Sequence, residues 1–422
     1  MKQNILKVFA VFTIAALSTL WSGLQGAEWY KGQLHCHSHW SDGNTLPELA
    51  IGWYKDNGYQ FMSLTDHNVL QLNPNRWKEV PAANINASKE KFGADFVETK
   101  EEDGKTLIRL KTFAELAKKF NAPGKFLLIP GHEQNTSIVG FSLHGNAINI
   151  TDTVPFPKEF PSVAAAASAW RKAALENSAQ NGLEGYWMLN HPDWPYYDNS
   201  PEVLIEAGEI EFYENNMAGG TKKRQPQMPD CEKYWDIVNA FRLLGGNKPI
   251  YSVATDDTHN YLTFRDNVAI PGHGWVVVRA EKLDANSLFR AMKKGDFYSS
   301  CGIVLKDVSF DPETKTLKVD VKPEENVKYT IRFIGTKKGF DTKKVPFEIP
   351  ADEEEKLALR KGFTYSDQIG AVFKTVEGTS ASYKMAPEDM YVRAVITSDK
   401  THQYKGQNKP EVQTAWTQPV GW

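Results

Sequence analysis

Short apolar segments alternate with amphipathic helical segments from about residue 30 to residue 300, and this alternation constrains the fold more than any other feature. Strands that alternate with helices are typical of parallel β–α–β units. Seven or eight such units in roughly 270 residues predict a TIM-like closed barrel, distorted in places. The alternative is an open doubly wound sheet, but no glycine-rich phosphate loop follows the first predicted strand. Strands are expected at residues 32–38, 61–67, 126–133, 144–150, 186–192, 209–214, 249–259 and 274–280.

Amphipathic stretches between these strands predict four helices. The first begins with Thr45-Leu46-Pro47-Glu48, which predicts a capping box with proline in the first turn, and it ends at Gly58. The other three are expected at residues 162–178, 231–244 and 286–294.

Residues 68–125 interrupt the alternation as a polar insertion with one clear helix, which a capping box of Thr112 and Glu115 begins. Long insertions in barrels often lie beside the active site, so we expect a loop or lid there. With this insertion, the barrel is expected to span residues 28–302.

The pattern changes after about residue 303, where turn residues recur and helical periodicity is scarce. Residues 317–321 alternate with a period of two, and residues 329–334 and 391–396 are rich in strand formers. These features predict a second, all-β domain over residues 303–422, a small sandwich of about 120 residues.

The first 27 residues resemble a secretory signal peptide. Lys2 and Lys7 precede an apolar run over residues 8–21, which is shorter than the ~20 residues that span a bilayer. A buried N-terminal helix is the alternative. No later segment is long and apolar enough to span a membrane, so we expect a periplasmic or secreted protein without a membrane span after signal removal.

Composition excludes several classes of protein. The 422 residues are 41% hydrophobic and 24% charged, values that exclude a mainly disordered or collagen-like chain. A net charge of -3 disfavours a nucleic-acid-binding surface, and three cysteines cannot form a disulfide framework. Ten histidines are an ordinary number, but their positions are not.

Most of the histidines stand at the end of a predicted strand, and in a parallel barrel this edge carries the active site. His35 and His37 are two residues apart, so in an extended segment their side chains point the same way. Asp257 and His259 have the same spacing. Imidazole and carboxylate groups together bind ions such as Zn, Fe and Mn, so the pattern predicts a metal site rather than unrelated core or surface histidines.

These motifs resemble those of the PHP superfamily (polymerase and histidinol phosphatase), over roughly residues 30–300. The resemblance implies a distorted (β/α)7 barrel similar to the amidohydrolases, a centre that usually holds three metal ions, and phosphoester hydrolysis. It is carried by His35-x-His37, Ser41-Asp42-Gly43, Thr65-Asp66-His67, Pro130-Gly131-x-Glu133, His144, His191 and Asp257-x-His259.

The same resemblance implies three overlapping sets of metal ligands. They are His35, His37, Glu133 and Asp257 for the first ion, Glu133 with His144 and His191 for the second, and Asp42, His67 and His259 for the third. Asp256 is an alternative to Asp257. Family members often have aspartate two residues before the first histidine, where this chain has Gln33, and the difference affects how a neighbouring ligand is oriented.

Divalent ions about 3.5–4 Å apart can clamp a phosphate group and activate a water molecule, so no serine or cysteine nucleophile is required. We therefore expect a metal-bridging hydroxide as the nucleophile, with Glu133, Asp257 and His259 as the catalytic residues. Candidate proton donors are His39, Asp66 and Asp193.

Basic residues near the expected site are candidates to attract an anionic substrate, and aromatic residues are candidates for a rim around a sugar or base. The basic candidates are Lys222, Lys223, Arg224 and Arg265, and the aromatic ones are Trp40, Trp194, Tyr196 and Tyr197. Outside the site, Cys36, Cys231 and Cys301 are expected to be packing residues, and His273 and His402 surface turn residues.

The sequence thus predicts an exported metal-dependent phosphoesterase that acts on a small phosphomonoester or a phosphodiester. One alternative is an amidohydrolase-like, metal-dependent hydrolase of a C–N or C–O bond. The other is a non-catalytic protein that binds a glycan or a partner, with the barrel as its scaffold.

Overall fold

The structure is a computed structural model. It describes residues 26–138, 140–155, 159–192, 199–217, 227–351, 359–406 and 409–422. The predicted signal peptide lies outside these ranges except for its last two residues. Among the described residues, no helix has the length and apolar character needed to cross a membrane.

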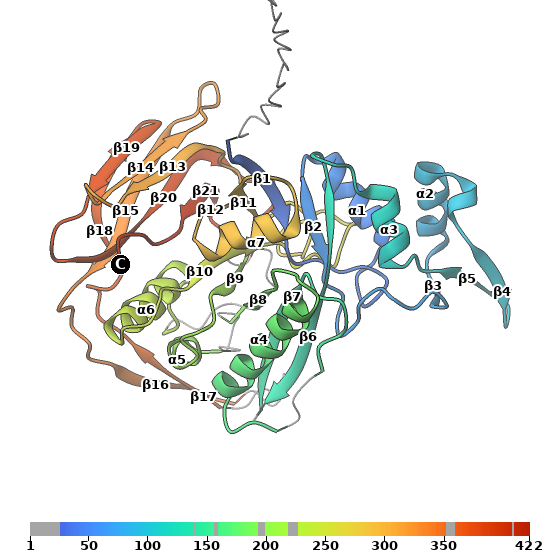
Figure 1. Cartoon of the computed structure of the whole chain (residues 1–422), viewed down its shortest axis with the longest axis horizontal. Helices are drawn as coiled ribbons and strands as arrows, with labels where there is room; N and C mark the ends of the chain where they lie inside the picture. The colour runs from blue at the N-terminus through green and yellow to red at the C-terminus, as the bar shows by residue number, and fades with distance from the viewer. Residues whose placement is uncertain are drawn as a thin grey trace, which may run out of the picture.

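The fold is mixed α/β, with a large sheet that runs through the molecule and seven α-helices among the described residues (Figure 1). Eight strands from the first part of the chain belong to this sheet. They are β1 (Glu28–Gln33), β2 (Phe61–Leu64), β6 (Leu127–Ile138), β7 (Phe141–Ile148), β8 (Tyr186–Leu189), β9 (Phe212–Asn216), β10 (Tyr251–Thr255) and β11 (Trp275–Ala280). All eight lie at or within a few residues of the predicted strands.

The pairing of these strands differs from an all-parallel barrel. The order is β10-β9-β8-β7-β6-β2-β1-β11, and β7 is antiparallel to both β6 and β8, as β11 is to β1. Only two residues separate β6 from β7, and so short a connection can join only antiparallel strands. The ladder is not closed, since β10 does not pair with β1, and an isolated bridge between Cys36 and Thr258 joins the segments that follow these two strands. The predicted closed barrel is therefore not confirmed.

The four predicted helices of this part are present as α1 (Pro47–Asp56), α4 (Val163–Gln180), α6 (Cys231–Leu244) and α7 (Ala285–Lys293). The predicted capping box of α1 is wrong. Leu46 is the N-cap residue, and Pro47 takes the first helical position. The carboxylate of Glu48 is buried and accepts a hydrogen bond from the Ser88 hydroxyl at 2.6 Å, so it is not available to cap the helix. A further helix, α5 (Pro201–Glu206), was not predicted.

The insertion at residues 68–125 forms a small substructure of its own. It contains α2 (Ala82–Phe92), α3 (Phe113–Phe120) and a three-stranded sheet of β3 (Trp77–Glu79), β5 (Lys105–Arg109) and β4 (Thr99–Glu102). The capping box of Thr112 and Glu115 at the start of α3 is confirmed. The Lys78 ammonium donates to the carbonyls of His39 and Ser41 at 2.9 and 2.8 Å, so the insertion packs against the segment that follows β1.

The C-terminal part of the chain is all-β, and the large sheet continues into it. Strand β12 (Phe297–Ser300) follows β11 in this order, and the C-terminal strands β21 (Val412–Thr417), β20 (Asp389–Thr401), β15 (Tyr329–Lys337) and β18 (Ala371–Glu377) extend it. A second sheet holds β13 (Leu305–Asp311), β14 (Thr316–Val321) and β19 (Ser380–Lys384), while β16 (Val345–Ile349) pairs with β17 (Arg360–Thr364). Val319, Ile331 and Ile396 share one buried cluster, as in a two-layer β-sandwich.

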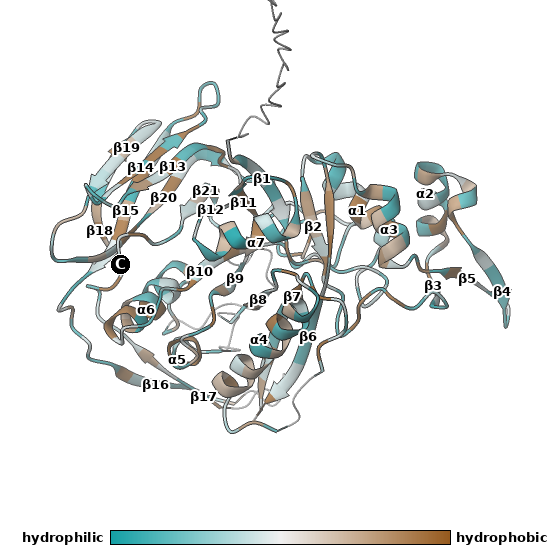
Figure 2. Ribbon diagram, in the orientation of Figure 1, coloured by the Kyte–Doolittle hydropathy of each residue, from teal (hydrophilic) through white to brown (hydrophobic). Residues whose placement is uncertain are grey.

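Apolar residues follow the central strands in Figure 2. Phe61, Ile129, Met188 and Val253, from strands β2, β6, β8 and β10, lie in one buried apolar cluster. The polar residues of the motifs come later along the same strands. The fold therefore separates an apolar interior from a polar edge where these motifs meet.

Candidate metal centre

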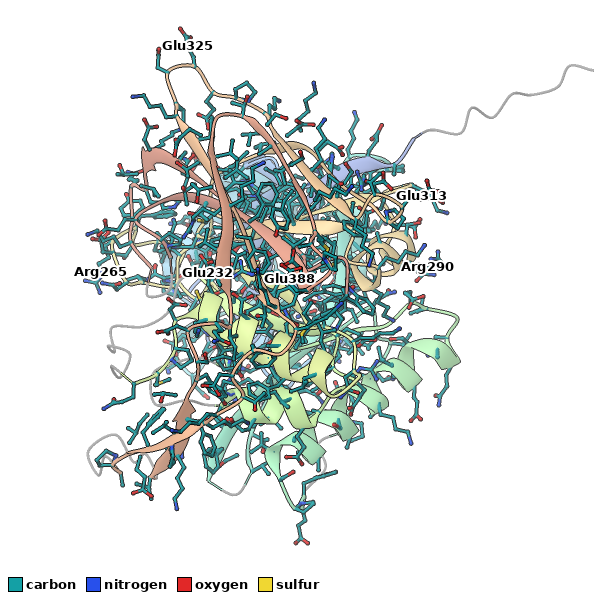
Figure 3. All side chains as sticks on the ribbon, turned by 90° about the vertical axis from the view of Figure 1, so that its left-hand side faces the viewer. Glu232, Arg265, Arg290, Glu313, Glu325 and Glu388 are labelled. Carbon is teal, nitrogen blue, oxygen red and sulfur yellow. The ribbon has the colours of Figure 1, made fainter. Side chains whose placement is uncertain are left out.

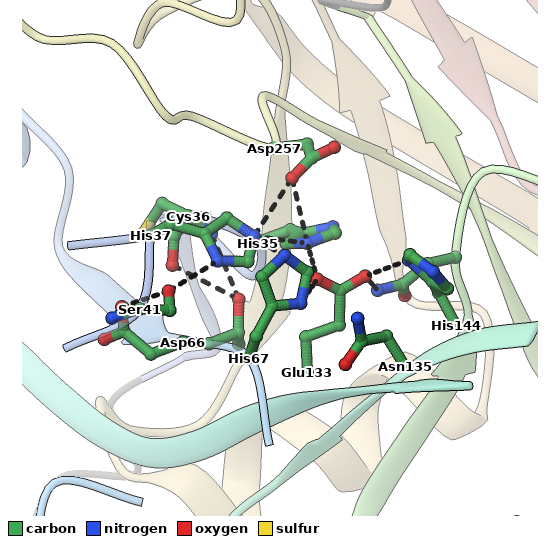
Figure 4. Close-up of polar contacts among 12 residues, drawn as sticks. His35, Cys36, His37, Ser41, Asp66, His67, Glu133, Asn135, His144 and Asp257 are labelled. Carbon is green, nitrogen blue, oxygen red and sulfur yellow. Dashed lines mark hydrogen bonds and ion pairs between the residues drawn. The ribbon is translucent and has the colours of Figure 1, made fainter. Parts of the chain in front are cut away.

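The structure brings the nine predicted ligands together at one edge of the sheet. Their ligand atoms form three overlapping groups, each with all atoms within 4.8 Å of one another, and each group is able to hold a metal ion. Figure 4 shows most of these side chains converging on Glu133. The groups are His35, His37, Glu133 and Asp257; Glu133, His144 and His191; and His37, Asp42, His67 and His259.

The chain leaves the sheet at Gln33, just before the first ligands. The side-chain oxygen of Gln33 accepts the backbone N–H groups of Leu34 and His35 at 3.0 and 3.1 Å, so these donors cannot extend the ladder. The segment stays extended as far as the bridge at Cys36, and His35 and His37 still face each other with their Nε2 atoms 3.1 Å apart. Cys36 points away and donates to the carbonyl of Ser63 at 3.3 Å.

The first group has the dimensions of a metal site. The Nε2 atoms of His35 and His37 each lie 3.1 Å from Oδ1 of Asp257 and 3.3 Å from Oε2 of Glu133. A tetrahedron of ligands at about 2.0–2.1 Å from a central ion has edges of about 3.3 Å. The four atoms are therefore spaced as ligands of one ion, and imidazole and carboxylate groups suit a borderline divalent metal.

The two carboxylate oxygens of Glu133 face two different ligand groups. Oε2 belongs to the first group, whereas Oε1 lies 3.2 Å from Nδ1 of His144 and 3.6 Å from Nε2 of His191. Because β7 runs antiparallel to β6, His144 near the start of β7 lies opposite the later part of β6 and so close to Glu133. A carboxylate in this position could bridge two ions.

The third group is built around Asp42 in a turn after β1. Its carboxylate oxygens lie 3.3 Å from Nε2 of His259 and 3.6 Å from Nε2 of His67. The turn needs a glycine at Gly43, because a Cβ atom there would lie 2.6 Å from the backbone of His37. Asp42 and His259 are also the most exposed side chains of the cluster, so the group faces solvent.

The charges of the cluster are strongly coupled. Burial opposes ionisation of Glu133, but the charge of His35 and hydrogen bonds from His144 and His191 hold the pKa of this carboxyl well below its usual range. Burial likewise lowers the pKa of His259, but Asp257 and Asp42 outweigh it and raise that pKa to about 9. Burial and the nearby charge of His259 lower the pKa of His37 to about 4. The protein thus holds the carboxylates ionised, and a metal ion that binds at His259 must displace the proton that this imidazole carries at neutral pH.

Two of the candidate ligands have an uncommon backbone conformation. His191 has φ of 26° and Asp257 has φ of 46°, both in the left-handed region that non-glycine residues rarely adopt. Such conformations persist only where surrounding contacts enforce them, and they gather at functional sites.

Glu214 in the middle of β9 is a site residue that sequence reasoning missed. It is fully buried, its Oε1 lies 2.5 Å from Nδ1 of His35, and its Oε2 accepts the backbone N–H of His191 at 2.9 Å. The Thr255 hydroxyl also donates to it. Its position at a predicted strand end was the available signal, but Glu214 has no motif around it.

Asp256 and Asp257 have different roles despite being neighbours. The carboxylate of Asp256 turns away from the cluster and accepts the backbone N–H groups of Gly272 and Gly274 at 2.8 and 2.7 Å and the Tyr54 hydroxyl at 3.0 Å. Of the two aspartates, only Asp257 faces the ligands.

Two of the candidate proton donors, Asp66 and His39, are buried and hydrogen-bonded in ways that do not suit this role. Asp66 is buried and accepts hydrogen bonds from the backbone N–H and hydroxyl groups of Ser38 and Ser41, so it organises the turn that carries Asp42. His39 is buried against Asn84 of the insertion, 2.7 Å from its amide nitrogen. The third candidate, Asp193, lies outside the described residues.

The structure does not support a substrate contact for Arg265 or Trp40, the two predicted contacts among the described residues. Arg265 is exposed at the periphery of the molecule (Figure 3), and no described contact joins it to the cluster. Trp40 is fully buried and donates to the Lys111 carbonyl at 3.0 Å, so it forms no rim. The remaining candidates, Lys222, Lys223, Arg224, Trp194, Tyr196 and Tyr197, lie outside the described residues.

Two further histidines were expected at the surface. His273 is buried with 1% of its surface exposed, so that prediction is wrong, because β11 and the loop before it pack against the C-terminal strands. His402 is partly buried, and its Nε2 lies 3.4 Å from Sγ of the buried Cys301.

Comparison with known proteins finds distant structural likeness. No protein-family model and no curated protein sequence matches the chain. A solved two-domain protein from Bacteroides vulgatus, described as containing a predicted PHP-like metal-dependent phosphoesterase, is similar over 94% of this chain and 96% of its own, with 15% identity and a TM-score of 0.39.

Two further solved structures match 54% of this chain and 87% of their own at 13% identity. One is a candidate metal-dependent phosphoesterase from Bifidobacterium adolescentis, with a TM-score of 0.30. The other is an amidohydrolase from Chromobacterium violaceum with bound sulfate, with a TM-score of 0.27. At these values, the functional argument rests on the geometry of the cluster.

Proposed function

We propose that this chain is a metal-dependent phosphoesterase of the PHP type, exported from the cytoplasm, that hydrolyses a phosphomonoester or a phosphodiester. The observation that carries the proposal is the pair of ligand groups joined through Glu133, whose two oxygens face His35 and His144 separately. A lone structural metal site needs no such shared carboxylate. The apolar run that follows Lys2 and Lys7 supports export.

The burial and the donor atoms of the ligand groups suit divalent ions. The ligands of the first group, His35, His37, Glu133 and Asp257, are all buried, so an ion there would be shielded from water on the protein side. Asp42, His67 and His259 form the more open side, where a substrate could approach. Zn, Mn or Fe fits this donor set.

Bound divalent ions would supply positive charge for the phosphate oxygens and would lower the pKa of a bound water. The protein's part is to hold the ligands in place and to keep the carboxylates ionised. Three divalent ions would outweigh the charge of the three carboxylates Asp42, Glu133 and Asp257. An anionic phosphoester would then be attracted to a protein whose overall charge is -3.

The test combines metal analysis of the purified protein with assays on a phosphomonoester and a phosphodiester of 4-nitrophenol. We expect two or three equivalents of divalent metal and turnover that falls by at least about 1,000-fold in Asp257→Ala, because several kcal/mol of charge stabilisation depend on the ions. Asp311→Ala, at the exposed end of β13 in the C-terminal part, is the matched control and should keep full activity.

Two results would overturn the proposal. Bound metal without phosphoester turnover would favour hydrolysis of a C–N or C–O bond at the same centre. If no metal is bound after purification in metal-supplemented buffer, both enzyme assignments are wrong, and a non-catalytic binding protein is the remaining alternative.

A further inference from the structure

A second cavity, of about 340 Å³, lies on the other side of Asp256 from the metal ligands. It is bordered by β1, by α1, by the loop that follows His259 and by the connection between β20 and β21. Asn267 and Lys405 hold the two loops together, since Asn267 N–H donates to the Lys405 carbonyl at 2.7 Å. The side chains that shape it are Lys31, Trp53, Tyr59, Trp275, Tyr404 and Lys409.

Two lysines bring positive charge to this cavity, and the nearby carboxylate of Asp256 is hydrogen-bonded to Tyr54, Gly272 and Gly274 instead. Neither Lys31 nor Lys409 has an ion pair among the described residues. The Lys31 ammonium instead lies 3.9 Å from the ring centre of Tyr59 and 4.0 Å from that of Trp275. The two ring faces offset only part of the free energy that it costs to bury the Lys31 ammonium. Burial therefore lowers the pKa of Lys31 to about 8. The pocket therefore offers cations that an anion would stabilise.

The cavity also offers polar and apolar contacts of the kind a sugar uses. Asn57 and Gln403 belong to the lining, and their side-chain amides can both donate and accept hydrogen bonds. At the mouth, the rings of Phe264 and Tyr404 lie 6.1 Å apart and form an apolar wall.

We propose that this cavity binds an anionic monosaccharide, a sugar ring that carries a carboxylate or a phosphate group. Lys31 and Lys409 would pair with the anionic group, and the rings of Trp53, Phe264 and Tyr404 would pack against the apolar face of the sugar. A volume of about 340 Å³ matches a single ring rather than a polymer segment. The mixture of aromatic walls and a few polar groups is typical of small-molecule sites.

This site is separate from the candidate metal centre. Gly272 lines the cavity, and its N–H donates to Asp256 at 2.8 Å, whereas the neighbouring Asp257 faces the opposite way into the ligand cluster. The proposal therefore stands whether or not the metal centre hydrolyses phosphoesters.

The experiment is a calorimetric titration of the full-length mature protein with D-glucuronate and with D-glucose 6-phosphate, which distinguishes a carboxylate from a phosphate ligand. D-Glucose and inorganic phosphate are the comparison ligands. We expect saturable binding of at least one anionic sugar, and at least tenfold weaker binding in Lys31→Met and in Lys409→Met. Lys405→Met, an exposed lysine of the same loop, should change the affinity less than twofold.

A sugar phosphate could also bind at the metal ligands, so the titration is repeated with His67→Ala. Binding that persists in His67→Ala and weakens in both lysine variants supports the proposal. Three results would overturn it: binding lost in His67→Ala but kept in the lysine variants, equal affinity for D-glucose or for inorganic phosphate, or no saturable binding of either anionic sugar.

Discussion

Glu214 places a buried carboxylate oxygen 2.5 Å from Nδ1 of His35, on the side of the imidazole that faces away from the other ligands. A hydrogen bond there places the proton on Nδ1 and leaves Nε2 free to bind a metal. The second oxygen of Glu214 accepts the backbone N–H of His191 at 2.9 Å. One side chain from β9 therefore positions a ligand of the first group and a ligand of the second.

Glu214→Gln should weaken metal binding without removing any ligand. Loss of the partner of a metal-binding histidine typically costs 10–100-fold in metal affinity, and we expect a loss in this range here. Competition with a chelator of known affinity measures it. Glu209→Gln, an exposed residue just before the same strand, is the matched control, and an equal loss in both variants would contradict the positioning role.

The overlap of the three ligand groups predicts a pattern of metal stoichiometry. His191→Ala should lose the ion of the second group only, and His259→Ala that of the third group only, because each belongs to a single group. Glu133→Ala should lose two ions, since its two oxygens serve two groups. Metal content per chain, measured by elemental analysis after gel filtration, checks this, and the loss of every ion in all three variants would contradict independent sites.

The strands and the ligand positions could be predicted from the sequence because both are local features. Each strand is a short apolar run, and His35, His67 and Asp257 follow such runs directly. Since the ends of neighbouring strands meet at one edge of a sheet, residues distant in sequence were expected to meet there, and they do.

The pairing of the strands could not be predicted in the same way. The apolar pattern does not reveal that β6 continues to Ile138 and returns at Phe141, although that short turn decides that β7 is antiparallel. Helix α2 was missed because the run over residues 82–92 is polar on most sides. Glu214 was missed because its importance comes from contacts with His35 and His191, which only the fold creates.

The stability of the metal-free protein should depend on pH through His259. The pKa of this group is about 9 in the folded protein and about 6.5 in an unfolded chain, so it binds more protons when folded between these values. Its contribution to stability is complete below about pH 6.5 and is lost as the pH rises through about 9.

We therefore expect the Tm of the chelator-treated protein to fall from pH 7 to pH 10, and to fall less in His259→Asn. Thermal unfolding followed by fluorescence at several pH values measures this difference. With metal bound, the imidazole carries no proton at neutral pH, so the fall should be smaller in the loaded protein. A Tm that falls equally in the wild type and in His259→Asn would show that another group titrates.

The C-terminal strands should stabilise the first part of the chain through one buried ion pair. Asp236 of α6 accepts from Nε and Nη2 of Arg393 in β20 at 3.0 and 2.6 Å, and Tyr391 donates to the same carboxylate at 2.6 Å. Removal of one partner of a buried pair costs about 3–5 kcal/mol, and Arg393 would keep only the partly exposed Glu232 at 3.3 Å. Asp236→Ala should lower the free energy of unfolding in urea by about this amount.

Glu388→Ala is the control for this pair, because it removes an exposed partner of Lys337 and should change the free energy of unfolding far less than Asp236→Ala does. Because β12 pairs with β21 and α6 is tied to β20, we expect the two predicted domains to unfold in one transition. If Asp236→Ala instead unfolds in two steps, the Asp236–Arg393 pair is the main link between the two domains, and each domain is stable by itself. If Asp236→Ala and Glu388→Ala cost the same, the buried pair contributes no more than a surface pair, and the apolar contacts of the shared sheet hold the two parts together.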